Sequence, residues 1–120
     1  MEWQEKVWGR TRIEAESPFY QLHRLEVIEG GFCSIHYHEH RANRFRVLSG
    51  EIEVIEWFAD ITKAVRLTAG NIHDVPSLVV HQFRVLRSGE VIEEYWPDRL
   101  GQHSVETSDI IRITEGGMSR

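Results

Sequence analysis

The feature that most limits the fold of this chain is a succession of short segments that are rich in β-branched and aromatic residues. Glycine, proline, asparagine or aspartate separates these segments, a spacing typical of an all-β sandwich or barrel. Because a barrel leaves few exposed strand edges, we expect a closed or nearly closed β structure. We predict strands over residues 19–28, 32–40, 43–48, 51–58, 61–67, 71–75, 79–86, 91–96 and 109–114, with turns at Gly30-Gly31, Ser49-Gly50, Ala59-Asp60, Ala69-Gly70 and Ser88-Gly89.

Length and charge limit the class of protein further. A chain of 120 residues is expected to form one domain, residues 1–120, and the segment with Trp3 and Trp8 is expected to pack on its outside. No run approaches the roughly 18 apolar residues of a membrane span, which argues against a membrane role. The formal net charge of -5 argues against nucleic-acid binding, because proteins of that class concentrate positive charge on one face.

The single cysteine, Cys33, cannot form a disulfide within the chain, and no charged and then apolar leader opens the sequence. Both observations predict a cytoplasmic location.

Three histidines alternate along one predicted strand. Successive side chains of a strand point to opposite faces, so His36, His38 and His40 are expected to share one face. Burying several imidazoles together is costly unless something binds them, and the pattern therefore indicates a metal ion. His40 could bind the ion, act as an acid or base beside it, or face solvent in the following turn. We expect His73 to lie at the rim of the barrel. His23 and His103 are expected to be structural or surface residues.

Two spaced motifs surround these histidines. The first reads Gly30, five residues, His36, one residue, His38, four residues, Asn43, six residues and Gly50. The second reads Gly70, five residues, Pro76, four residues and His81. They resemble the motifs G(x5)HxH(x3,4)E(x6)G and G(x5)PxGxxH of the cupin superfamily, with Asn43 at the glutamate position and Leu78 at the middle glycine.

The resemblance to cupins implies a double-stranded β-helix, or jelly-roll barrel, that holds one divalent metal ion. The ligands that it implies are His36, His38, Asn43 and His81. Imidazole nitrogen binds borderline divalent metals, so the candidates are Zn, Ni, Fe and Mn. An asparagine carbonyl is a weaker ligand than a carboxylate, and hard cations such as Mn and Mg should be held less well.

Nearly the whole chain also resembles the C-terminal cupin domain of type II mannose-6-phosphate isomerases, which is often fused to mannose-1-phosphate guanylyltransferase. The most specific match is HEHRANRFRVLSG, from His38 to Gly50, which resembles HHHRAEHWIVVSG. The other matching segments are Lys6-Val7-Trp8-Gly9, Phe19 through His23-Arg24-Leu25 with Val27 and Gly30, Glu94, Leu100-Gly101, and Ser108-Asp109-Ile110-Ile111-Arg112.

This second resemblance implies a metal-dependent aldose-ketose isomerase acting on sugar phosphates. Such a reaction needs a Lewis acid, a group that moves a proton between adjacent carbons, and a cation for the phosphate. The catalytic residues that we predict are His40, as acid or base, and Arg41, as the anion clamp. Asn43 cannot transfer a proton as the family's glutamate would. The alternatives to Arg41 are Arg24, Arg44 and Arg46. Of these, Arg44 and Arg46 are expected on a solvated strand face.

Two other functions compete with the isomerase. Three histidines with a weak fourth ligand would also suit a non-haem metal dioxygenase. Asparagine at position 43 would equally suit a non-catalytic carbohydrate-binding or sensor protein. In each case the predicted partner is a small molecule, a sugar or sugar phosphate for the isomerase, and the expected assembly is a homodimer formed through edge strands.

Overall fold

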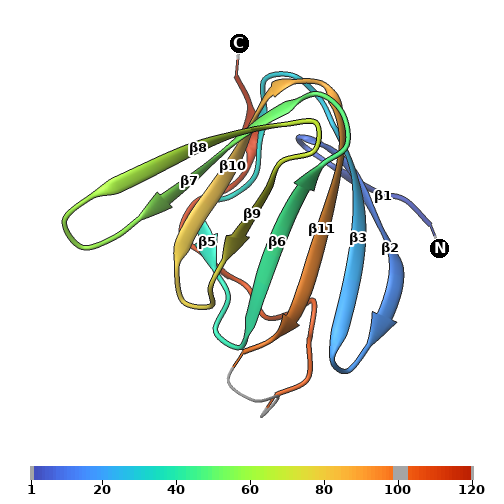
Figure 1. The fold of residues 1–120 in the computed structure, drawn as a ribbon, viewed down its shortest axis with the longest axis vertical. Helices are drawn as coiled ribbons and strands as arrows, with labels where there is room; N and C mark the ends of the chain where they lie inside the picture. Colours follow the sequence, from blue (N-terminus) through green and yellow to red (C-terminus); the bar gives the residue numbers. More distant parts are fainter. Residues whose placement is uncertain (1, 99–102, 120) are drawn as a thin grey trace.

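The computed structural model describes residues 2–98 and 103–119, within which the chain forms strands and turns and no helix. Two residues of the resemblance to isomerases, Leu100 and Gly101, lie outside the described residues. The strands in chain order are β1 Gln4–Lys6, β2 Gly9–Ser17, β3 Tyr20–Val27, β4 Gly31–Phe32, β5 His36–Tyr37, β6 Arg41–Val47, β7 Glu51–Trp57, β8 Thr62–Thr68, β9 Ile72–Val75, β10 Val80–Arg87, β11 Gly89–Pro97, β12 Ile111–Arg112 and β13 Gly117–Met118 (Figure 1).

These strands form two antiparallel sheets. The first has the order β1-β2-β3-β11-β6-β9. The second is built on β10, which pairs with β7 along one edge and with β4 and β5 along the other. β13 and β12 extend this sheet beyond β4 and β5, and β8 extends it beyond β7. The two sheets thus face each other across one interior, from which the β7–β8 hairpin extends (Figure 1).

The predicted all-β fold is confirmed, but several strand boundaries differ. The predicted strand 32–40 is broken, because only Gly31–Phe32 and His36–Tyr37 pair with β10. The predicted strand 109–114 is reduced to Ile111–Arg112. β1 and β2 were not predicted because their residues are mostly polar and lie at the exposed edge of the first sheet, where apolar alternation is weak.

The hydrophobic core lies between the sheets, and it includes Trp8. The expectation that this tryptophan packs on the outside is wrong: it is 8% exposed, and its ring meets that of Phe83 edge to face at 5.1 Å. Trp3 is half-buried outside this core, and the guanidinium groups of Arg10 and Arg12 lie over its ring. The other core residues are Leu25, Val27, Cys33, Phe45, Val47, Ile52, Val54, Leu67, Val75, Val85 and Val91.

The β7–β8 hairpin leaves one strand edge open. Its turn is the predicted Ala59-Asp60 turn, closed by a hydrogen bond from the Phe58 N–H to the Ile61 carbonyl at 2.8 Å. Within residues 2–98 and 103–119, β8 pairs with β7 alone. An open edge can pair with another chain, so the homodimer stays a prediction. The described residues contain no helix that could cross a membrane.

Replacing Trp8 by alanine is expected to lower the free energy of unfolding by about 3–5 kcal/mol, because the change leaves a cavity between the sheets. Trp3→Ala is the matched control. It removes a ring outside the core with cation–π contacts worth about 0.5–1 kcal/mol, so the loss should be far smaller. Urea unfolding of both variants measures the difference, and equal losses would contradict the placement of Trp8 in the core.

Candidate metal centre and adjoining cavity

Three imidazole rings meet at the inner face of the second sheet. His36 on β5 lies directly opposite His81 on β10, and His38 follows just beyond the end of β5. The rings are 8%, 1% and 2% exposed, respectively, and their centroids are 4.6–5.2 Å apart. One nitrogen from each ring lies within 4.8 Å of the other two. The structure therefore brings together the three histidines that the two sequence motifs single out.

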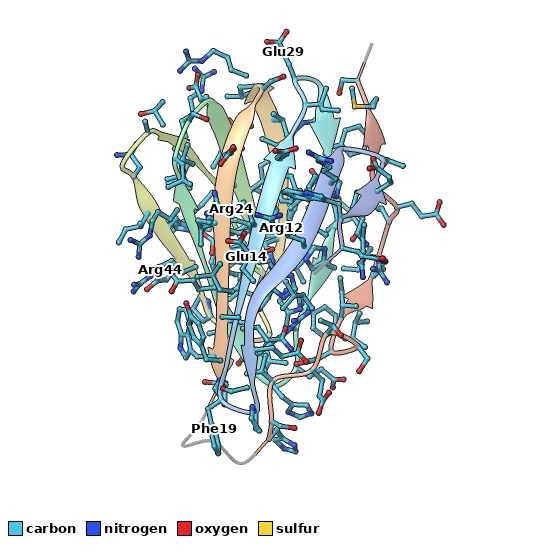
Figure 2. The ribbon with its side chains drawn as sticks, turned by 90° about the vertical axis from the view of Figure 1, so that its right-hand side faces the viewer. Arg12, Glu14, Phe19, Arg24, Glu29 and Arg44 are labelled. Carbon is cyan, nitrogen blue, oxygen red and sulfur yellow. The ribbon has the colours of Figure 1, made fainter. Side chains whose placement is uncertain are left out.

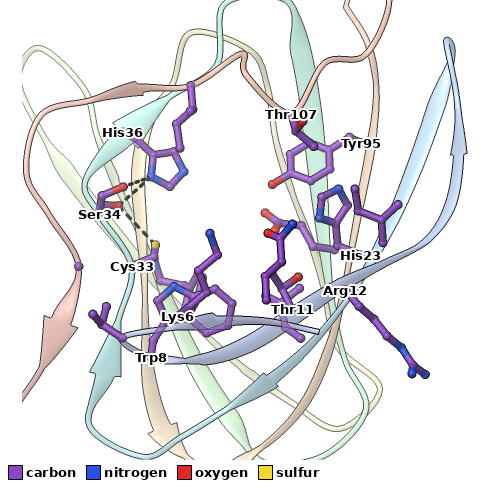
Figure 3. Close-up of a pocket in the computed structure, with 18 of the residues that line it drawn as sticks. Lys6, Trp8, Thr11, Arg12, His23, Cys33, Ser34, His36, Tyr95 and Thr107 are labelled. Atoms are coloured by element: carbon purple, nitrogen blue, oxygen red, sulfur yellow. Dashed lines mark hydrogen bonds between the residues drawn. The ribbon is translucent and has the colours of Figure 1, made fainter. Parts of the chain in front are cut away.

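Each ring is oriented by a backbone carbonyl group that accepts a hydrogen bond from Nδ1. The bond runs from His36 to Ser34 at 2.8 Å, from His38 to Asp109 at 2.7 Å and from His81 to Val79 at 2.8 Å. Figure 3 shows the bonds between His36 and Ser34, whose hydroxyl group also lies 2.8 Å from Nδ1. Because a carbonyl oxygen can only accept, Nδ1 carries the proton in every ring and Nε2 keeps its lone pair.

Burial keeps these rings neutral. It is the largest cause that lowers the pKa of His36 to about 2, with smaller contributions from His81 and His38. Burial and then the charge of Arg41 lower the pKa of His38 to about 3, and burial lowers that of His81 to about 4. Neutral imidazole is the form that binds metal ions, so the three rings stand ready as ligands at neutral pH.

Several buried acceptor atoms have no hydrogen-bond partner in the described part of the chain. Nε2 of His38, Nε2 of His81 and Oδ1 of Asn43 are all buried and unpaired among the described residues. An unsatisfied buried polar atom costs about 1–3 kcal/mol. A cation at the cluster would satisfy the two imidazole nitrogens, and three neutral imidazoles, with an amide oxygen as a further donor, form a suitable set for a borderline divalent ion. The residues present therefore fit a metal ion.

Asn43 is oriented by a carboxyl group that the sequence analysis missed. Its amide Nδ2 donates to Oε2 of Glu93 at 2.8 Å, which leaves Oδ1 as the unpaired atom. Glu93 is 8% exposed, and burial raises its pKa to about 7. The signal that could have found it is the alternation of Val91, Glu93 and Tyr95, which places a carboxyl group on the inward face of β11.

Asp109 holds the segment that carries His38. Its two carboxylate oxygens accept hydrogen bonds from the backbone N–H groups of Glu39 and His40, each at 2.8 Å. Its carbonyl oxygen accepts from His38 Nδ1 and from Arg41 Nε, the latter at 3.2 Å. One residue near the C-terminus thus fixes both a ring of the cluster and a neighbouring guanidinium group.

Leu78 holds the same segment from the opposite side. Its N–H donates to the carbonyl oxygen of His38 at 2.7 Å, and its φ of 69° lies in the left-handed region. Leucine rarely adopts this conformation. Leu78 occupies the motif position at which cupins have glycine, so the backbone keeps a glycine-like geometry there although the side chain differs.

A cavity of about 490 Å³ opens beside the cluster, between the first sheet and the N- and C-terminal segments (Figure 3). Arg41 lines it and is 4% exposed. Its guanidinium group lies 3.9 Å from the centroid of the Tyr95 ring, which in turn packs on His38 at 5.6 Å. The other residues that matter for its chemistry are Lys6, Thr11, His23, Glu93 and Arg112.

Solved structures share this arrangement of strands. No family model and no curated protein matches the sequence. KdgF from Halomonas sp. is 23% identical, with a TM-score of 0.71 over 83% of this chain and 89% of that one. Oxalate decarboxylase from Bacillus subtilis is 13% identical (TM-score 0.78, 93% of this chain), and CapF is 14% identical (TM-score 0.75, 94% of this chain). The chain spans only 30% and 34% of the latter two.

The chain has the cupin fold. This confirms the fold that the two motifs imply. The finer resemblance, to type II mannose-6-phosphate isomerases, stays a prediction.

The three alternative arginines lie on the outer face of the first sheet, where Figure 2 shows two of them. Each is engaged in ion pairs: Arg24 with Glu14 and Glu90, Arg44 with Asp74, and Arg46 with Glu94. The solvated face expected for the last two is therefore what the structure shows, and of the four candidate arginines Arg41 is the one that lies beside the cluster.

The remaining four histidines lie outside the cluster. The expectation that His40 shares a face with His36 and His38 is wrong, because the strand ends at Tyr37; His40 is exposed and stacks on His103 at 3.8 Å. Its role as acid or base stays a prediction. His23 was expected to be structural or at the surface, yet it lines the cavity. The remaining one, His73, is half-buried, 3.0 Å from Oε1 of Glu56.

Asp109→Ala is expected to weaken zinc binding by about 10–100-fold, because the segment with His38 loses both carboxylate bonds. Asp109→Asn keeps one acceptor and should fall between this variant and the unmodified protein. Asp60→Ala, in the β7–β8 turn, is the control. Zinc titration against a competing chelator measures the affinities, and an unchanged affinity in Asp109→Ala would contradict this holding role.

Proposed function

We propose that this protein is a metal-binding cupin whose ion is held by Nε2 of His36, His38 and His81 with Oδ1 of Asn43. The observation that carries the proposal is the set of Nδ1 bonds to backbone carbonyls, which turns three neutral lone pairs toward one another. A neutral donor set favours Zn, Ni or Fe over Mn. Another protein with this fold, oxalate decarboxylase from Bacillus subtilis, has Mn(II) centres.

We further propose that the bound ion serves an aldose-ketose isomerisation of a sugar phosphate. The ion would supply Lewis acidity that polarises the carbonyl and hydroxyl oxygens of the substrate. The reaction also requires a group that takes a proton from one carbon and returns it to the next. Asn43 cannot do this, but the carboxyl group of Glu93 lines the same cavity and is hydrogen-bonded to that asparagine. Glu93 therefore supplies the carboxyl group that position 43 lacks.

Two further residues would orient the substrate. Arg41 offers a guanidinium group for the phosphate and is held in place by Tyr95 and the carbonyl oxygen of Asp109. The buried ring of Tyr95 covers the cavity wall between Arg41 and His38 and limits the access of water. Positioning of this kind lowers the barrier by fixing the substrate near the proton-transfer group.

His81→Ala tests the metal site. Removing one of three imidazoles is expected to lower the affinity for zinc by at least about 100-fold, beyond the 10–100-fold effect of losing an outer hydrogen-bond partner. His103→Ala, which removes an exposed ring outside the cluster, should leave the affinity unchanged. Metal analysis of the purified proteins and chelator competition measure both. Metal retained by the His81 variant would show that the proposed ligand set is wrong.

The isomerase proposal predicts interconversion of mannose 6-phosphate and fructose 6-phosphate by the metal-loaded protein. Glu93→Gln keeps the size of the side chain and the contact with Asn43 but cannot accept a proton, so turnover should fall by about 100-fold or more. Glu94→Gln is the control on the neighbouring residue. NMR of the sugar phosphates measures both directions, and the absence of turnover with several sugar phosphates would remove this proposal.

Two further measurements separate the alternatives. Oxygen uptake by iron-loaded protein would favour the dioxygenase, which the three histidines also suit. A sugar that raises the melting temperature without forming product would favour the non-catalytic binding protein.

A further inference from the structure

The buried polar side-chain atoms that lack a partner divide by chemical type. Among residues 2–98 and 103–119 there are five: three acceptors at the metal centre, and two others, Nη1 of Arg41 and Oγ1 of Thr11. An arginine nitrogen can only donate, and a threonine hydroxyl group can donate. A bound cation would satisfy the unpaired acceptors, whereas the oxygen atoms of a bound anion would satisfy the unpaired donors.

Both donors line the cavity, although they come from different strands. Thr11 lies on β2 and Arg41 begins β6. The guanidinium group of Arg41 is fixed on one face by the Tyr95 ring and at Nε by the carbonyl oxygen of Asp109. A planar guanidinium group that is held in this way is already oriented for a carboxylate or phosphate, and little conformational entropy is lost on binding.

Two further cations of the cavity have no carboxylate partner. Lys6 on β1 extends into the cavity (Figure 3). Arg112 on β12 also lines it. Neither lies within ion-pair distance of an acidic group in the described part of the chain. Arg12 also belongs to the lining, but it is paired with Glu14 at 2.7 Å and points away. In a chain of net charge -5, this gathering of unpaired cations is a local feature.

Two acidic groups also line the cavity and offset part of this positive charge. They are Glu5, which is exposed, and Glu93, which is hydrogen-bonded to Asn43. The pKa of His23 is lowered to about 4, by burial first and then by the charges of Arg41 and Lys6. These two cations therefore contribute a positive potential inside the cavity.

We propose that the cavity binds the anionic group, a carboxylate or a phosphate, of a small ligand through Arg41 and Thr11, with Lys6 and Arg112 adding positive charge. The site lies beside the histidine cluster, because Arg41 and His38 donate to the same carbonyl oxygen. That the ligand is a substrate rests on the proposed function. The anion site itself needs no metal ion, so an experiment can contradict the anion site without contradicting the proposed metal centre, and the reverse.

Mannose, mannuronate and mannose 6-phosphate form a matched series of probes that differ only at carbon 6. We expect one of the two anions to bind at least about tenfold more tightly than neutral mannose, with an affinity that falls as salt is added. The better anion identifies the group as carboxylate or phosphate. Calorimetric titration of metal-free and zinc-loaded protein measures this, and equal or absent binding of all three sugars to both forms would overturn the proposal.

Two variants assign the binding to these residues. Arg41→Met should lower the affinity for the more tightly bound anion by at least about tenfold. Thr11→Val keeps the shape of the side chain and should lower this affinity by about threefold or more. Arg44→Met, at a half-buried position on the outer face of the first sheet, and Thr62→Val, at an exposed position, are the matched controls. If the Arg41→Met variant does not fold, the Thr11→Val variant alone tests whether these residues bind the anion. Anion binding that survives Thr11→Val, or that is lost in Arg44→Met, would overturn the assignment.

The metal and anion proposals give distinguishable results. Anion binding by protein that takes up no metal would remove the metal centre and keep the anion site. Zinc binding without preference for either anion would keep the metal centre and overturn the anion site.

Discussion

The site depends on three hydrogen bonds from Nδ1 of an imidazole to a backbone carbonyl oxygen. Without them each ring could present either nitrogen, and its neutral form would have two tautomers. With them, Nε2 of His36, His38 and His81 is the only lone pair available, and the rings cannot rotate without losing a buried bond. The acceptors are carbonyl groups of Ser34, Asp109 and Val79, so the fold of the backbone, rather than further side chains, sets the chemistry of the cluster.

Neither sheet builds the site alone. The second sheet carries His36 and His81, whereas the first carries Asn43, Glu93 and Tyr95. The two sets meet only because the apolar faces of the sheets pack on each other, with Trp8 and Phe83 closing one part of that core. The C-terminal segment completes the arrangement through Asp109. The stability of the core and the geometry of the site are therefore coupled, and a change that separates the sheets would disperse the ligands.

The sequence predicts this site in part, and the reasons differ from residue to residue. The sequence predicts His36, His38 and His81 because each motif that contains them lies within a short stretch of the chain. Arg41 is visible for the same reason. The break in the strand after Tyr37 is not visible, because the bonds that replace strand pairing come from Asp109, about seventy residues away. Glu93 is missed although its alternation with Val91 and Tyr95 indicates an inward position, because the sequence alone does not show that this carboxyl group meets Asn43. Thr11 is missed because nothing near it in the sequence distinguishes an inward polar side chain from one that faces solvent.

Asparagine at position 43 changes the distribution of charge more than its amount. A glutamate there would place a carboxylate among the ligands. In this chain residue 43 offers a neutral, unpaired amide oxygen, and the carboxyl group of Glu93 accepts a hydrogen bond from the amide nitrogen of the same residue. An ion bound by neutral donors keeps more of its positive charge, which strengthens its pull on an incoming oxygen atom. The same excess of positive character extends into the cavity through Arg41 and Lys6. If the proposed function holds, residue 43 would favour an anionic ligand, and Glu93 would be the group that exchanges a proton.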